Sequence, residues 1–197
     1  MVGSQGALPA FRTILGYLPA SFPAAVVFDL HRRQSNDFAA ALLAKASHLP
    51  VESVSETTRL RPGAVLVTPP DRQTVLTETE LMPTSTRGRD RMGHPFADRL
   101  LTTAAAAFGP RLICVVLSGR LAGGAEGVRA AKQCGARVLV QDPASASAPS
   151  MPRAALATGC VDFVLPPESL GAALAALCAA PGAAELFRVR LNTAVHM

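Results

Sequence analysis

The residues best suited to chemistry are a serine and a histidine that follow two successive predicted strands. Ser4 lies in the small-residue stretch GSQGA, which begins at Gly3 and comes directly before an apolar helix. Free amide donors and the positive dipole end of that helix could activate Ser4 as a nucleophile or hold a phosphate, or Ser4 could simply be an N-cap. His31 directly follows the apolar run at residues 26–30. Both would face the same edge of a parallel sheet, where His31 could serve Ser4 as general base.

Short apolar runs alternate with alanine-rich amphipathic segments along the chain. The runs predict an abbreviated strand at residues 1–2 and further strands at 26–30, 65–68, 112–117, 137–140 and 161–165. The amphipathic segments predict helices at 8–18, from a cap at Ser35 or Asn36 to about 46, and at 95–108, 124–134 and 168–179. This alternation, with short connections, predicts an α/β fold: a doubly wound, mostly parallel, Rossmann-like sheet with helices on both faces.

Residues 68–80 interrupt this alternation. Two short extended runs flank the sequence PPDR, which predicts an inserted β-hairpin. Two polar stretches, at 84–94 and 142–152, are expected to form loops. The second follows a strand and should lie at the carboxyl edge of the sheet, where open α/β folds bind ligands. We expect residues 1–180 to form one domain and residues 181–197 a C-terminal appendage.

The composition narrows the functional class. The 197 residues are 49% hydrophobic and 17% charged, which excludes wholesale disorder. No apolar run reaches the ~18 residues of a membrane helix and the start lacks a secretory signal, so we expect a cytoplasmic protein without membrane insertion. The net charge is +5, but the basic residues are scattered and Trp is absent, which favours an acidic protein partner over nucleic acid. The four cysteines form no CxxC pair, so no metal site is expected.

Six stretches between Met1 and about Cys178 match, in order, the motifs of one known family. They are VGSQGA for a G-[AS]-S-x-G-G turn, VVFDLH for a strand that ends in a catalytic histidine, PGAVLVTPPDRQ for a hairpin, PFADRLL for a helix, VVLSGRLAGGA for a strand and turn, and VQDPASASAPSMPRAA for a stretch ending in G-M-P-[RK]-A. On these motifs the chain resembles the C-terminal catalytic domain of the chemotaxis protein-glutamate methylesterases.

The resemblance implies a reaction and a set of residues. The family hydrolyses glutamyl methyl esters on chemoreceptor helices with a Ser-His-Asp triad and without a metal or organic cofactor. Carried over by position, Ser4 is the nucleophile and His31 its base. Backbone amides near Gln5 and Arg120 would hold the oxyanion, with Arg120 standing where the family has Met. The triad Asp falls on Gly123, which has no carboxylate.

Two carboxylates are candidates for the missing acid. Asp142 ends the strand after the one that carries the Gly123 turn and could approach the site, whereas Glu126 is near Gly123 but should lie inside a helix. Asp29 is expected to point away from the residues next to His31 or back into the helix layer, and it is not a candidate. Arg32, Arg33 and Met151 would form the substrate rim.

Two functional hypotheses remain open. In the first the chain is a carboxylester hydrolase in which Ser4 attacks the ester and His31 passes the proton to methanol, with a methylated chemoreceptor or similar acidic helical protein as partner. In the second it is a degenerate, catalytically weak or inactive binding or signalling module that lacks the triad Asp. A phosphate-binding protein is disfavoured because no full G-x-G-x-x-G motif is present. The family usually carries an N-terminal receiver domain, and no receiver-like segment is expected in this chain.

Overall fold

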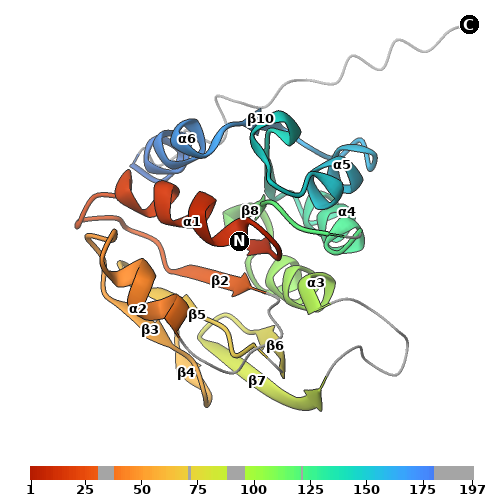
Figure 1. The fold of residues 1–197 in the computed structure, drawn as a ribbon. Helices are drawn as coiled ribbons and strands as arrows, with labels where there is room; N and C mark the ends of the chain where they lie inside the picture. The colour runs from red at the N-terminus through yellow and green to blue at the C-terminus, as the bar shows by residue number, and fades with distance from the viewer. Residues whose placement is uncertain (31–37, 71, 88–95, 121, 180–197) are drawn as a thin grey trace, which may run out of the picture.

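The computed structural model describes residues 1–30, 38–70, 72–87, 96–120 and 122–179, and its main element is a parallel sheet (Figure 1). The strands of this sheet are β1 (Val2–Gly3), β2 (Val26–Leu30), β3 (Val51–Ser53), β5 (Val65–Val67), β8 (Ile113–Val116), β9 (Arg137–Gln141) and β10 (Phe163–Leu165). Their order is β10-β9-β8-β1-β2-β5-β3, and every pairing is parallel. The short β1 therefore lies at the centre of the sheet.

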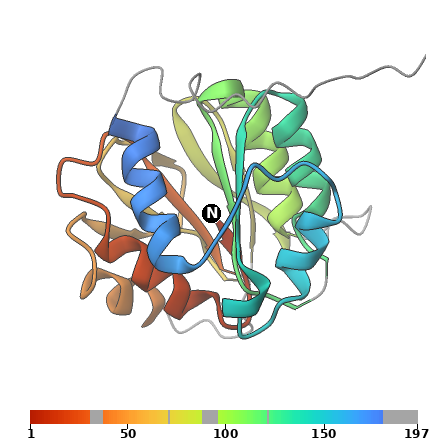
Figure 2. The ribbon, with the colours of Figure 1, turned by 90° about the horizontal axis from the view of Figure 1, so that it is seen from above.

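Six helices cover the two faces of this sheet in the described part of the chain. They are α1 (Ala7–Gly16), α2 (Phe38–Ala44), α3 (Phe96–Phe108), α4 (Ala125–Gln133), α5 (Ser150–Leu156) and α6 (Pro167–Ala179). Helices α1, α2 and α6 bury their apolar residues in one core, and α3, α4 and α5 bury theirs in a second core on the other face (Figure 2). The predicted doubly wound α/β fold is confirmed.

A small antiparallel sheet packs beside α3. It consists of β4 (Thr58–Arg59), β6 (Arg72–Leu76) and β7 (Glu80–Arg87), in the order β4-β7-β6. The predicted hairpin is thus present, but its turn lies at residues 77–79 rather than at PPDR. The run before PPDR is β5, which is buried throughout and belongs to the main sheet. The two prolines therefore lie in the connection between β5 of the main sheet and β6 of the small sheet.

Other boundaries also differ from the prediction. Strand β7 extends into the expected loop at 84–94, and α5 begins at Ser150 inside the expected loop at 142–152. Strand β10 begins two residues later than expected, at Phe163. Strands β3 and β4 were not expected, because runs of two and three residues carry no recognisable periodicity. The expected caps of α2 at 35–36 and the appendage at 181–197 lie outside the described residues.

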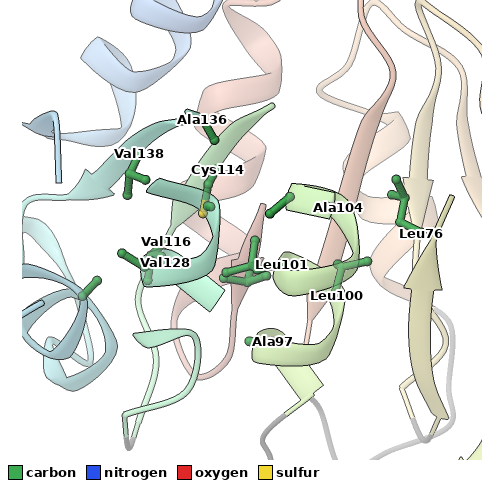
Figure 3. Close-up of a cluster of buried hydrophobic side chains, with 14 of the residues drawn as sticks. Leu76, Ala97, Leu100, Leu101, Ala104, Cys114, Val116, Val128, Ala136 and Val138 are labelled. Carbon is green, nitrogen blue, oxygen red and sulfur yellow. The ribbon is translucent and has the colours of Figure 1, made fainter. Parts of the chain in front are cut away.

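The contact between α3 and α4 shows how closely the second core is packed (Figure 3). Leu101 of α3 lies over Gly127 of α4, where an added Cβ would be 2.5 Å from the Leu101 Cβ. The carboxylate of Asp98 accepts a hydrogen bond of 2.8 Å from the Gly127 amide, although Asp98 is itself buried. Glycine therefore allows the two helices to approach this closely.

In the described part of the chain, no helix has the length and apolar character required to cross a membrane.

Gly127→Ala should destabilise the protein by about 1–3 kcal/mol, because the new methyl group must displace a buried leucine. Gly16→Ala is the matched control, since Gly16 is also helical and its Cβ would meet nothing closer than 3.8 Å. That control should be neutral or stabilise by up to about 1 kcal/mol. Urea unfolding of both variants gives the comparison, and equal effects would contradict the packing described here.

Candidate active site

Ser4 lies at the carboxyl end of the central strand, immediately before α1. Its amide donates to the carbonyl of Ser118 (3.0 Å), and its carbonyl accepts from the amide of Ala7 (3.1 Å). The N-cap of α1 is Gly6, whose φ of 77° is in the left-handed region, and no side chain caps this helix. Ser4 is therefore not an N-cap. It is half-buried in a sharp strand-to-helix turn, the setting in which α/β enzymes present a nucleophile.

A buried hydroxyl from the next strand holds this turn. Ser118 follows β8 and has no exposed surface. Its Oγ donates to the carbonyl of Gln5 (2.8 Å) and accepts from the amide of Ala148 (2.9 Å). A Cβ added to Gly6 would lie 2.7 Å from this hydroxyl, so the turn and Ser118 fit together only with glycine at that position. Ser118 thus joins the Ser4 turn to the loop after β9.

The loop after β9 is fixed to the same point by a buried amide side chain. Gln141, at the end of β9, accepts at its Oε1 from the Ser118 amide (2.9 Å). Its Nε2 donates to the carbonyl of Ser145 (3.2 Å). The amide of Gly119 adds a bond to the carbonyl of Ala148 (2.8 Å). Three segments far apart in sequence therefore meet at the carboxyl edge of the sheet.

Gly119 lies between Ser4 and the start of α5. A Cβ at this position would be 3.1 Å from the Ser4 Cβ and 2.0 Å from the Met151 Sδ. Met151, at 3% exposure, belongs to the core rather than to a substrate-facing rim, which corrects the expectation for this residue. Met151 is the first apolar residue of α5, and its side chain packs against Gly119 of the turn.

The two predicted oxyanion positions, Gln5 and Arg120, are both exposed. Within the described residues, neither backbone amide donates a hydrogen bond to another group. Gln5 follows Ser4 directly, and Arg120 follows Gly119, the residue that touches Ser4.

Glu126 and Asp142, the two carboxylates considered in place of Gly123, both lie in described parts of the chain. Gly123 lies in the turn before α4, and Glu126 is exposed in the first turn of that helix. Asp142 directly follows β9, which is two strands from β1, and its carboxylate caps a short 3-10 turn by accepting from the amide of Ala144 (2.9 Å).

Asp29 is buried in the layer between the sheet and α3, which is one of the two placements expected for it. It is 5% exposed, and its Oδ1 accepts a hydrogen bond of 2.6 Å from the hydroxyl of Thr68, which is fully buried. It pairs in register with Val2 of the central strand, on the face of the sheet that carries α3. The sequence analysis named Asp29 without giving it a role, and it did not single out Thr68, Ser118 and Gln141. Their shared signal is a polar side chain at the end of an apolar strand.

Three predicted residues, His31, Arg32 and Arg33, lie outside the described residues.

A cavity of about 450 Å³ lies at the opposite, amino edge of the sheet and is lined among others by Val26, Ile113 and Leu174. It contains none of the candidate residues. In the described ranges, no cluster of His, Cys, Asp and Glu has the arrangement of a metal site.

Ser118→Ala should destabilise the protein by about 1–3 kcal/mol, because it leaves the Gln5 carbonyl and the Ala148 amide without their buried partner. Ser47→Ala is the control: Ser47 makes the same two types of bond with Leu49, but in a partly exposed loop where water can replace them. Urea unfolding should show a clearly larger loss for Ser118→Ala. An equal or smaller loss would contradict the role given to this hydroxyl.

Comparisons with known proteins identify one family. The family model for the CheB methylesterase matches residues 1–174. The protein-glutamate methylesterase/protein-glutamine glutaminase of Moorella thermoacetica is 33% identical over 91% of this chain and 43% of its own length. A putative protein of the same description from Leptospira interrogans is 30% identical over 85% of this chain and 87% of its own length.

The solved structures give the same result. The crystal structure of the Thermotoga maritima CheB methylesterase catalytic domain superposes with a TM-score of 0.80 at 25% identity, over 89% of this chain and 95% of that domain. The chain thus spans less than half of the Moorella relative but nearly the whole of an isolated catalytic domain. By sequence and by fold, this chain belongs to the CheB methylesterase family.

Proposed function

We propose that the chain is a carboxylester hydrolase that removes methyl esters from glutamate side chains of chemoreceptor helices. One observation carries the proposal: Ser4 lies at the carboxyl end of the central strand, in a turn whose backbone is held by Ser118. The amides of Gln5 and Arg120, adjacent to it, donate to no group among the described residues. A nucleophile beside free backbone donors is the arrangement that acyl transfer requires.

His31 is the proposed general base. In the described part of β1 and β2, Val2 pairs with Asp29 and Gly3 pairs with Leu30. The assignment itself comes from the sequence, where a histidine directly after the strand that neighbours β1 is suited to act as base for Ser4.

The proposed reaction has two steps. The Oγ of Ser4 attacks the ester carbonyl and loses its proton to the imidazole of His31, and the amides of Gln5 and Arg120 stabilise the oxyanion. The C–O bond to methanol then breaks, and His31 returns the proton to the leaving methoxide oxygen. Water next attacks the glutamyl ester of Ser4, again with His31 as base, which releases the glutamate carboxylate and restores the Ser4 hydroxyl.

The charge of the chain suits an acidic substrate. The net charge is +5, and Arg120 is exposed beside the Ser4 turn. Receptor helices that contain glutamates and glutamyl esters would be attracted to this edge of the sheet by their opposite charge. The relatives named above bear protein-glutamate methylesterase in their names, and the substrate proposed here is of that class. We place this activity in the cytoplasm as part of the same proposal.

Ser4→Ala should abolish methanol release from a methylated receptor, with a fall of about 10³-fold or more, because no other group can form the acyl intermediate. Ser55→Ala is the control. It changes an exposed serine between β3 and β4 and should leave the rate unchanged. Methanol is measured after incubation of each folded variant with the radiolabelled methyl ester. A Ser4→Ala rate equal to that of the unsubstituted protein would contradict the enzyme and favour the non-catalytic module.

A further inference from the structure

We infer that the cavity at the amino edge of the main sheet binds an extended apolar peptide of another molecule, which adds to the sheet as a strand between β2 and β8. The inference goes beyond the proposed esterase and does not rest on it. The cavity is lined by Val26 and Ile113, the first residues of β2 and β8, whereas Ser4 lies at the carboxyl end of β1.

A gap in strand pairing lies in the middle of the main sheet. Strand β1 pairs with β2 from Asp29 onward and with β8 at Val116. On their other sides, β2 already pairs with β5 from Val26, and β8 pairs with β9 from Ile113. Between the amino-terminal parts of β2 and β8 the described residues provide no strand, and the cavity occupies this gap. Because β2 and β8 both flank β1, the gap has room for one strand.

Backbone groups of β2 point into this gap. The Met1 amino group donates to the Val27 carbonyl (2.7 Å), and the Met1 carbonyl accepts from the Asp29 amide (2.9 Å). Val27 therefore faces the β1 side of its strand, whereas the Val26 amide donates to the Ala64 carbonyl on the other side (2.9 Å). The amide and the carbonyl of one strand residue point in the same direction. The Val27 amide thus points into the gap, where no described strand offers it an acceptor.

Strand β8 presents the same arrangement from the opposite side of the gap. The Leu117 amide donates to the Val2 carbonyl of β1 (2.9 Å), whereas the Leu112 carbonyl accepts from the Arg137 amide of β9 (3.0 Å). Backbone direction alternates along a strand, so Ile113 shares the direction of Leu117 and points its amide and carbonyl into the gap. Unpaired backbone groups away from water cost free energy. A strand laid between β2 and β8 supplies partners on both sides.

Apolar side chains cover the gap on both faces of the sheet. On one face these are Leu100 and Ala104 of α3 and Leu76 of β6 (Figure 3). On the other face they include Phe22 and Leu174. An extended strand sends alternate side chains to opposite faces, so a bound segment would bury side chains on both. The segment that fits is therefore aliphatic at every position, as in the covered strands of this sheet.

The backbone groups distinguish a peptide from other apolar molecules as the occupant. A lipid chain would fill the apolar space, but it offers no acceptor to the amides of Val27 and Ile113. Each residue of an extended peptide offers a donor, an acceptor and a side chain. Main-chain bonds of this kind supply the affinity when a peptide adds to a sheet as a strand.

Binding of a synthetic peptide to the 197-residue protein tests the inference. The peptide has four alternating valine and isoleucine residues after two lysines that keep it in solution. In a control peptide, proline replaces the two central aliphatic residues, which removes their amide donors. At saturation the first peptide should slow hydrogen exchange of the Val27 and Ile113 amides, measured by NMR, by about tenfold or more. The proline peptide should give no protection.

Ala104→Leu should weaken binding of the valine-isoleucine peptide by about tenfold or more, because the larger side chain enters the cavity from α3. Ala106→Leu is the matched control: it lies on the exposed side of the same helix and should leave the Kd unchanged. If Ala104→Leu does not fold, Ala25→Leu takes its place, since Ala25 lines the same cavity and is half-buried. Isothermal titration calorimetry measures the Kd of each folded variant.

The other occupants of the gap give distinct results. Protection of the Val27 and Ile113 amides in the unliganded monomer would mean that the chain itself fills the gap. Protection that rises with protein concentration would mean that a second copy fills it. Binding of dodecanoate without binding of the peptide would make the cavity a lipid site. Each of these results, or equal binding of the proline peptide, overturns the inference and leaves the esterase untouched, because methanol release is measured separately.

Discussion

One buried hydroxyl holds together the segments on which the candidate site depends. Ser118 bonds the Gln5 carbonyl on one side and the Ala148 amide on the other, and its own amide is held by Gln141. The strand-to-helix turn at Ser4 thus keeps a fixed shape although β1 has only two residues.

The sequence predicted most of the main sheet because its strands are buried on both faces. Runs such as LICVVL at 112–117 and VLV at 138–140 are apolar throughout, and such runs are typical of the covered strands of a parallel sheet. The small sheet was harder to predict, since its register depends on packing against α3 rather than on a local pattern. The prolines of PPDR were placed in a hairpin turn, whereas they mark the passage from β5 to β6.

The site was predictable only in part. The Ser4 turn follows from the small residues before an apolar helix, and the structure bears out its position at the end of the central strand. The contacts that hold this turn could not be predicted, because Ser118 and Gln141 gain their partners from segments distant in sequence. Asp29 was expected to point away from the residues next to His31 or back into the helix layer, and its burial on the α3 face agrees with the second placement.

The central claim is that Ser4 is an activated nucleophile. Its most direct test is reaction of the folded protein with a fluorophosphonate, followed by mass spectrometry of its peptides. This reagent phosphonylates a serine hydroxyl only where a base and oxyanion donors assist the displacement of fluoride. The account predicts one modified serine, Ser4, and no modification after unfolding in urea. A folded protein in which Ser4 remains unmodified, or in which another serine reacts in its place, would contradict it.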